Sequence, residues 1–269
     1  MGVPFVDIAT ILGLTLAVGA LLISVIMDGG HLSALISPSA ILLIIGGTLG
    51  ATIISFPMEE IINLPKLILR TFFSPKIDPK EAIDRVVSLA EKARREGLLI
   101  LQEDAKNITD RFLLRGLNLV IDGADPEMVK TIMETELAFT EKRHKRGAAI
   151  LEAAGGYAPT MGIIGTVMGL VHVLGNLEDT SKLGPAIAVA FLATFYGIST
   201  ANLFWLPLAN KLKERSREEM LLKEITLEGI LSIQAGENPR IVREKLEVFL
   251  PPKLQARQEE KARAERVEA

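Results

Sequence analysis

Hydrophobic residues gather in four long runs along this chain, and most of the charged residues lie between them. The runs that contain no Asp, Glu, Lys or Arg cover residues 8–27, 32–58, 153–177 and 183–210. A helix that crosses a bilayer needs roughly 20 predominantly apolar residues. Every run meets that length, so the sequence predicts four membrane-spanning helices. The first run lacks the basic flank of a cleavable signal and exceeds the roughly 7–15 apolar residues of one.

The polar stretches carry the start and stop signals of further helices. Asp78 can accept amide hydrogen bonds as an N-cap, Pro79 suits the first helical position, and Gly97 can end that helix in left-handed geometry. A second helix starts at Pro126 and meets no convincing breaker before the third apolar run. It is therefore predicted to continue directly into the third span. A short helix near the C-terminus is predicted to start at Asn238.

No stretch shows the clear period-two alternation of a strand, so the predicted fold class is all-α. The chain is predicted to be a polytopic membrane protein with four transmembrane helices and a helical cytoplasmic domain between helices 2 and 3. The expected stretches are a peripheral hairpin of two spans, a cytoplasmic helical domain, a second pair of spans, and cytoplasmic helices with a charged tail. Their boundaries are 1–58, 59–149, 150–210 and 211–269. Residues 56–73 form an amphipathic segment that is predicted to lie at the membrane surface.

Lysine and arginine are concentrated on one side of the predicted membrane. Residues 59–152 hold 16 of the 30 basic residues and residues 211–269 hold 13, whereas the short links within the two pairs of spans hold one. By the positive-inside rule, both termini and the large middle segment are expected in the cytoplasm. The net charge of −3 argues against a nucleic-acid partner, because there is no basic excess to neutralise phosphates.

The sequence offers little catalytic chemistry. It contains no Walker-type loop, HExxH, GxSxG or DxDxDG motif, so no enzymatic role is expected. Cysteine is absent, which excludes disulfides and thiolate chemistry, and the three histidines lie far apart, which argues against a metal site. The four spans also lack a carboxylate, although a proton or sodium path usually needs one. Either the chain forms no channel, or a partner subunit supplies the acidic group.

The third and fourth runs each carry one stripe of small residues that includes a threonine. At 100° per residue, each stripe falls on one narrow face of its helix. The two stripes are Gly162, Thr166, Gly169 and Val173, and Ala190, Thr194, Gly197 and Ala201. In one interpretation, each hydroxyl bonds the carbonyl four residues back in its own helix and the stripes only allow close packing. In the other, the two hydroxyls lie at similar depth beside an ion path.

Three further residues in these runs are candidates for a functional role. Pro159 and Pro207 both fall near the cytoplasmic boundary, where a proline can kink the helix or form a hinge, although such kinks are also an ordinary feature of membrane helices. His172 is an ionisable residue near the outer end of the third run. At that depth the histidine can simply face headgroups or water, and this is the interpretation we favour.

Several motifs together resemble the A-subunit family of bacterial flagellar stators, the MotA/PomA proteins. They are "ARREGLLILQ", "HKRGAAILEAAGGYAPTMGIIGTVMGLVHVL", "LGPAIAVAFLATFYG" and "LFWLPLANKLK", and the resemblance covers nearly the whole chain. It implies a multi-pass protein of the bacterial cytoplasmic (inner) membrane that works in motility and chemotaxis. It also implies a homopentamer around a dimer of MotB/PomB-type B subunits, each of which carries the ion-binding aspartate. The transported ion is H⁺ or Na⁺, and no cofactor is expected.

The resemblance also assigns roles to residues of the two stripes. Pro159 and Pro207 match the family's two functional prolines beside the ion path, and Thr166 and Thr194 match positions where sodium-type members have threonine. The 150–210 stretch is then the pore-lining pair of helices. Threonine hydroxyls suit a partly dehydrated sodium ion, so the pattern leans towards sodium, but proton transfer tolerates them.

In the same family, charged residues of the cytoplasmic domain contact the rotor protein FliG. Arg94 matches the rotor-facing arginine, whereas the rotor-facing glutamate falls on Gln102, which departs from the pattern. Glu103 is the next residue, but on a helix it points about 100° away from Gln102. The rotor contact by charge pairs is therefore less secure for this chain.

Two other functions remain open at this point. One is an energiser of the ExbB/TolQ type, which powers outer-membrane processes, although those proteins typically have three spans. The other is a non-conducting helical scaffold of the membrane, in which the glycine and threonine stripes only pack. The stretch "ARREG" favours the flagellar function.

Overall fold

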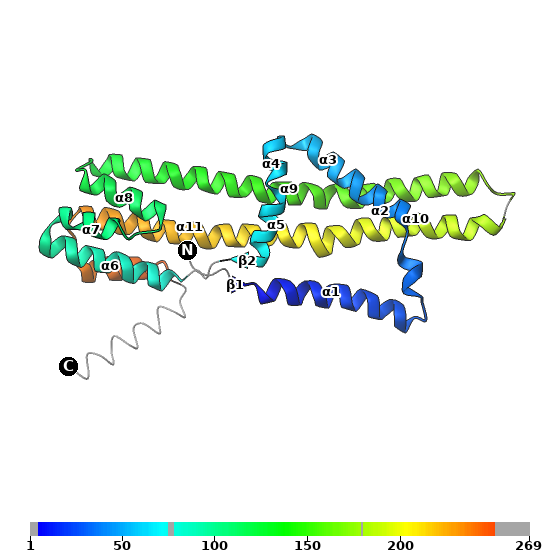
Figure 1. Ribbon diagram of the computed structural model, residues 1–269, viewed down its shortest axis with the longest axis horizontal. Helices are drawn as coiled ribbons and strands as arrows, with labels where there is room; N and C mark the ends of the chain where they lie inside the picture. Colours follow the sequence, from blue (N-terminus) through cyan, green and yellow to red (C-terminus); the bar gives the residue numbers. More distant parts are fainter. Residues whose placement is uncertain (1–4, 75–77, 179, 251–269) are drawn as a thin grey trace. The chain divides into compact units, whose positions relative to one another are not determined.

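A computed structural model of the chain describes residues 5–74, 78–178 and 180–250 (Figure 1). The chain divides into two compact units. We call Val3–Pro75 together with Arg143–Glu214 the apolar unit, and Lys76–Lys142 together with Arg215–Ala269 and the first two residues the charged unit. Each unit is described by itself.

The apolar unit begins with the first two candidate spans and the amphipathic segment. In chain order its elements are β1 (Phe5–Val6), α1 (Ile8–Met27), η1 (Leu32–Leu35), α2 (Pro38–Ile41), the π-helix η2 (Leu42–Gly46), α3 (Gly47–Ser55), α4 (Met58–Ile62), α5 (Leu64–Phe72) and β2 (Phe73–Ser74). The strands β1 and β2 form one short antiparallel pair, with Phe5 opposite Ser74. Apart from this pair, every regular element of the described chain is a helix, so the all-α prediction is confirmed.

Three long elements complete the apolar unit. They are the latter part of α9 (Pro126–Leu174), α10 (Thr180–Thr200) with the π-helix η4 (Ala201–Trp205), and the start of α11 (Leu206–Gln234). Four helical segments, Ile8–Met27, Leu32–Ser55, Pro126–Leu174 and Leu183–Gln234, are long and apolar enough to cross a membrane. The prediction of four spanning helices is confirmed. Helix α9 is also one continuous helix of 49 residues, as the absence of a breaker predicted.

Helix α1 is held mainly at its N-terminal end. Asp7 caps it by accepting a hydrogen bond from the amide of Thr10 (3.1 Å), and the Asp7 carboxylate also pairs with Lys211 of α11 at 2.6 Å. The Asp7 amide donates to the carbonyl of Phe72 (2.8 Å). No residue of α1 is buried within the described chain, as expected for a helix whose sides face lipid or other chains.

The amphipathic segment uses one apolar face to pack on the protein. Leu64 of α5 is buried and belongs to one cluster with Ile150, Leu151 and Leu208. Ile62, on α4, is 71% exposed, so apolar surface also remains outside this cluster. The location of the segment at the membrane surface stays a prediction.

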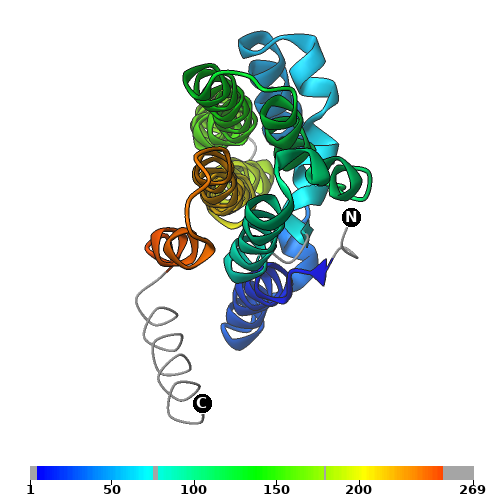
Figure 2. The same ribbon diagram turned by 90° about the vertical axis from the view of Figure 1, so that its left-hand side faces the viewer.

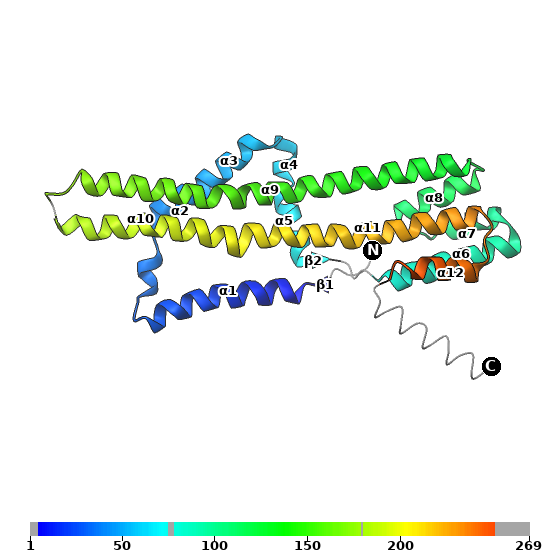
Figure 3. The same ribbon diagram turned by 180° about the vertical axis from the view of Figure 1, so that it is seen from behind.

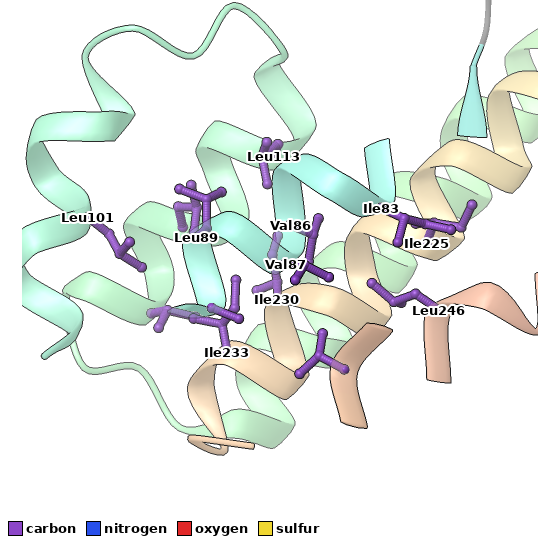
Figure 4. Close-up of a cluster of buried hydrophobic side chains, with 14 of the residues drawn as sticks. Ile83, Val86, Val87, Leu89, Leu101, Leu113, Ile225, Ile230, Ile233 and Leu246 are labelled. Atoms are coloured by element: carbon purple, nitrogen blue, oxygen red, sulfur yellow. The ribbon is translucent and has the colours of Figure 1, made fainter. Parts of the chain in front are cut away.

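The charged unit is a bundle around one hydrophobic core. Its elements are α6 (Pro79–Glu96), η3 (Leu98–Ile100), α7 (Leu101–Ala105), α8 (Arg111–Ile121), the first part of α9, the main part of α11, and α12 (Pro239–Glu247). Helices α6 and α12 are neighbours (Figures 2 and 3). Figure 4 shows the core, in which α6 contributes Val86 and Val87, and α11 contributes Ile225, Ile230 and Ile233.

Local signals explain the boundaries of these helices. Asp78 caps α6 through the amide of Lys80 (3.0 Å), and Gly97 ends the helix with φ +88°, which favours glycine. Helices α9 and α12 begin at Pro126 and Pro239, each the first helical residue after a capping side chain. These predicted starts and stops are confirmed. The charged tail, residues 251–269, lies outside the described residues.

Candidate functional site

The last part of α9 and helix α10 run antiparallel and side by side (Figures 1 and 3), and their backbones are in contact. A Cβ atom added at Gly162 would lie 3.0 Å from the Thr194 Cα and 3.1 Å from the carbonyl oxygen of Ala193. One added at Gly197 would lie only 2.5 Å from the carbonyl oxygen of Ala158. The two predicted stripes of small residues therefore face each other, and only glycine fits at these positions without displacing a backbone.

The threonine hydroxyls meet at this closest approach. Thr166 Oγ1 lies 3.1 Å from the carbonyl oxygen of Gly162 in its own helix and 3.2 Å from that of Ala190 in α10. Thr194 Oγ1 lies 3.2 Å from the Gly162 oxygen across the interface, and the two hydroxyls are hydrogen-bonded to each other. Thr166 thus makes the bond within its own helix, as one interpretation predicted. Both hydroxyls also reach a carbonyl of the opposite helix.

This arrangement gathers more acceptors than donors. Two hydroxyl and two carbonyl oxygens surround the contact, whereas the donors are the two hydroxyl protons and the backbone N–H groups that bond these carbonyls within each helix. Oxygen lone pairs therefore remain free to face a cation or a water molecule. Both threonine side chains are half-buried rather than sealed in the protein. A hydroxyl pair of this kind can contribute neutral oxygen ligands to a cation, but it cannot by itself balance the charge.

The two prolines lie at neighbouring levels of the α9 and α11 pair. Gly155, one turn before Pro159, packs so closely on Leu206 that an added Cβ would lie 2.6 Å from the leucine Cδ2. Leu206 is the residue before Pro207. The two prolines are therefore within about two helical turns of each other along the pair. Pro159 is half-buried and Pro207 is exposed.

The helix irregularity at Pro207 takes the form of a π turn. Proline has no N–H, and its ring clashes with the carbonyl four residues back, which here belongs to Leu203 inside η4. In η4 the amide of Leu206 instead bonds the carbonyl of Ala201, five residues back. Such π turns occur at irregular points of α-helices and frequently at functional sites. The sequence predicted an irregularity here but not its type.

Two tyrosines connect the hairpin of the first two spans to these helices, and neither was assigned a role from the sequence pattern. The hydroxyl of Tyr196 donates to the carbonyl of Leu35 and accepts from the amide of Ser37 (3.1 Å). The hydroxyl of Tyr157 is hydrogen-bonded to that of Ser55 (2.8 Å). The available signal was the polar end of a tyrosine within an apolar run, because such a hydroxyl needs a partner when it leaves water.

The other ionisable candidate lies away from the threonine pair. His172 is exposed near the C-terminal end of α9, and its backbone carbonyl accepts a hydrogen bond from the Asn176 side chain (2.8 Å). Six residues, nearly two turns, separate it from Thr166. Among residues 5–74, 78–178 and 180–250, no three His, Cys, Asp or Glu side chains gather in a way that could hold a metal ion.

The predicted rotor-facing residues lie on helices α6 and α7 of the charged unit. Arg94 is exposed in the last turn of α6, and Gln102 and Glu103 are exposed in α7. Lys92 and Asp104 join these two helices by an ion pair of 2.6 Å. Within the part of the chain that the structure describes, neither Arg94 nor Glu103 takes part in an ion pair, so both charges are available to a partner.

Comparison with known proteins agrees with this architecture. The family model described as the MotA/TolQ/ExbB proton channel family matches residues 104–225, and that described as Motility protein A N-terminal matches residues 11–97. The chain is 42% identical over 248 residues to Motility protein A of Bacillus subtilis (strain 168), covering 92% of each chain. It is 34% identical to the chemotaxis protein PomA of Vibrio alginolyticus, covering 91% of this chain and 95% of that one.

Two solved stator complexes share the fold. The flagellar MotAB stator complex from Bacillus subtilis aligns with a TM-score of 0.86 and 41% identity, covering 91% of this chain and 97% of that chain. The C. jejuni MotAB structure aligns with a TM-score of 0.87 and 29% identity, covering 91% and 96%. The similarity therefore extends over both units and all four candidate spans.

Proposed function

This chain belongs to the MotA/TolQ/ExbB proton channel family, and on that basis we propose that it is a membrane-embedded flagellar stator subunit that forms an ion channel with a B subunit. The stretches matched by the family models and the coverage of Motility protein A relatives support this function. Ion flow through the channel turns the flagellar rotor. The similarity to MotAB complexes supports the B-subunit partner.

The ion path runs beside the contact between α9 and α10. The observation that carries this proposal is the oxygen cluster of Thr166 and Thr194 within an otherwise apolar pair of spans. The apolar runs 153–177 and 183–210 contain no carboxylate, so the charge that balances the cation comes from an aspartate of the B subunit. Pro159 and Pro207 shape the cytoplasmic end of the path.

The coupling ion that this site favours is sodium. Two neutral hydroxyls can replace part of the hydration shell of a sodium ion, whereas a proton relay does not require them. Swimming at high sodium in the presence of a protonophore tests this choice. Continued motility is expected for sodium coupling, and motility abolished by the protonophore at every sodium concentration would rule it out.

A flux assay tests the path itself. The chain is co-expressed with its B subunit, and cation uptake into vesicles is compared between the wild type and Pro159→Leu. We expect the substitution to reduce uptake strongly, because it restores a backbone N–H and replaces the compact proline ring with a larger side chain beside the path. Wild-type uptake that is unaffected by Pro159→Leu would count against the assigned path, and no uptake by the wild type would count against the channel function.

The assembly around this path is a pentamer of this chain around a B dimer, in the bacterial inner membrane with surrounding lipid. Both termini lie in the cytoplasm, where 29 of the 30 basic residues then lie. Mass measurement of the intact complex in detergent tests the 5:2 stoichiometry. A ring of another size would contradict it.

The rotor contact is made by the charged unit. Arg94 and Glu103 are exposed, and the partner is the rotor protein FliG. Charge reversal at Arg94 is expected to reduce swimming without reducing ion flux, whereas Gln102→Ala is expected to have little effect because it removes no charge. Unchanged swimming in both variants would place the rotor contact elsewhere. An ExbB/TolQ-type energiser remains the second candidate, because the same family model covers those proteins.

A further inference from the structure

An acidic residue continues the line of the proposed path beyond the apolar run. Glu152 lies on α9, seven residues before Pro159 and fourteen before Thr166. At about 100° per residue, these three residues fall within about 40° on one face of the helix. Along α9 from Thr166 towards the charged sequence, Glu152 is the first residue with a charged side chain. It therefore lies where a cation on this face would leave the apolar run.

Glu152 links α9 with α11 through an ion pair. Its carboxylate accepts a hydrogen bond from the Lys213 ammonium group, so the ion pair connects α9 with α11. Backbones touch between Gly197 and Ala158, but at Gly155 the neighbouring atoms are side-chain atoms of Leu206 and Trp205. At Glu152 two long side chains make the contact. The pair thus lies at the end of the interface beyond the prolines.

Nearby ion pairs differ from this one in their position. Arg146 of α9 pairs with Glu60 of α4 at 3.1 Å, and Lys211 pairs with Asp7. Arg146 is 13 residues before Pro159 and 20 before Thr166, so it projects from α9 about 140–160° away from the face of these two residues. The Arg146–Glu60 ion pair therefore also links two helices, but it does not lie on the face of α9 that carries Pro159 and Thr166.

The Glu152 pair is also accessible to water. The Glu152 side chain is 40% exposed and that of Lys213 is 39% exposed. Opening an exposed pair costs little, since such pairs contribute roughly 0–1 kcal/mol. A carboxylate held in this way can exchange its lysine partner for a passing cation, whereas a buried pair could not.

We propose that Glu152 is the station at which the transported cation passes between the path and cytoplasmic water. The inference rests on the proposed ion-conducting function and deepens it. The carboxylate lowers the energy of a cation that has left the threonine oxygens but has not regained its full hydration. Lys213 balances the carboxylate when no cation is present. The station belongs to this chain, unlike the carboxylate of the B subunit.

The test compares maximal cation uptake by complexes with the B subunit that carry Glu152→Gln, Lys213→Gln or Glu60→Gln. Glu152→Gln is expected to lower maximal uptake about fivefold, because a favourable interaction of about 1 kcal/mol with the cation is lost. The half-saturating external cation concentration stays within about twofold, since the external entry is unchanged. Lys213→Gln breaks the same ion pair but keeps the carboxylate, so uptake is at least that of the wild type. Glu60→Gln, the matched control, leaves uptake unchanged.

A second measurement covers the case in which Glu152→Gln fails to assemble. The chain contains no cysteine, so Glu152→Cys introduces one reactive thiol into it. Modification by an anionic methanethiosulfonate reagent restores a negative charge and is expected to restore uptake, whereas a cationic reagent is not. The unmodified wild-type complex controls for thiols of the B subunit.

The outcomes separate the two proposals. Equal losses of uptake in Glu152→Gln and Lys213→Gln would show that Glu152 only links two helices, and this would overturn the inference. Equal recovery of uptake in Glu152→Cys after treatment with either reagent would overturn it in the same way. Unchanged uptake in Glu152→Gln would overturn it as well. If Pro159→Leu abolishes uptake in the same preparation, the proposed function stands in either case. A wild-type complex that takes up no cation would instead remove the function on which the inference rests.

Discussion

Replacing Gly197 with alanine is expected to force α9 and α10 apart at the threonine pair. The new Cβ would lie 2.5 Å from the carbonyl oxygen of Ala158 and 3.2 Å from the Cα of Gly162. Carbon and oxygen atoms approach each other to about 3.3 Å even in the closest favourable contacts. Because both neighbours are backbone atoms, no side-chain rotation relieves the overlap. The helices must separate by about 0.8 Å.

The expected cost follows from this displacement. The cross-helix distances from Thr166 to the Ala190 oxygen and from Thr194 to the Gly162 oxygen are both 3.2 Å. Adding about 0.8 Å brings each to about 4 Å, which is too long for a hydrogen bond. Interhelical hydrogen bonds in membranes average about 0.6 kcal/mol, and overpacking costs about 1–3 kcal/mol. The free energy of unfolding should therefore fall by about 2–4 kcal/mol.

The assay follows loss of helical circular dichroism in detergent during denaturation, together with cation uptake in vesicles. Gly184→Ala is the matched control, since it lies in the same helix and an added Cβ there meets nothing within 4 Å. Its stability should stay within about 0.5 kcal/mol of the wild type. Gly162→Ala, with contacts of 3.0 and 3.1 Å, should cost less than Gly197→Ala. If Gly197→Ala matches the wild type in both assays, close backbone contact between α9 and α10 is refuted.

Three other predictions concern the remaining contacts. Tyr196→Phe removes the hydroxyl that holds the peripheral hairpin through two hydrogen bonds, and should lower stability by about 1–2 kcal/mol in the same denaturation assay. Gly229→Ala in the core of the charged unit would place a Cβ 2.2 Å from Val86 Cγ1, and should cost about 1–3 kcal/mol. Burial raises the pKa of Glu247 above its ordinary value of 4.5, and the opposing charge of Arg243 does not cancel this effect. The contribution of this carboxyl to the free energy of unfolding is therefore present at low pH and is lost as the pH rises through the raised pKa. Glu247→Gln should therefore gain stability relative to the wild type between pH 4 and 7, measured by thermal denaturation.

Each of these predictions has a clear contrary result. Full stability of Tyr196→Phe, with Phe195→Leu as a packing control, would mean that the tyrosine does not anchor the hairpin. A stable Gly229→Ala would mean that α6 and α11 are less closely packed than described. If the difference in stability between Glu247→Gln and the wild type stays constant or reverses from pH 4 to 7, the pKa of Glu247 is not raised.

The elements of this fold were predictable because their signals are local. Asp78 and Pro79 start α6 through contacts within one turn, and the spans follow from the length of uninterrupted apolar sequence. The facing stripes could be predicted for the same reason, since helical periodicity alone places Gly162 and Thr166 on one face. A small-residue face in a membrane helix needs a partner helix, and α10 carried the matching pattern.

The details of the site depend on contacts that the sequence pattern does not encode. That Thr194 reaches the Gly162 carbonyl follows from the axial register between two helices, which small residues allow but do not fix. The partners of Tyr196 are backbone groups of a hairpin about 160 residues earlier in the chain, so no local spacing indicates them. The π type of the turn before Pro207 is likewise not indicated by any local spacing.

The π turn η4 also sets the rotational phase of the start of α11. Lys211 and Lys213 project about 200° apart, and they meet acidic partners on two different elements, Asp7 beside α1 and Glu152 on α9. A π turn accommodates one more residue per hydrogen-bonded ring than an α-helix. Deleting one residue from Ala201–Trp205 would leave the composition of the turn almost unchanged, yet it would rotate both lysines by about 100° relative to α10. The chain length of this turn, more than the identity of its side chains, therefore determines which acid each lysine faces.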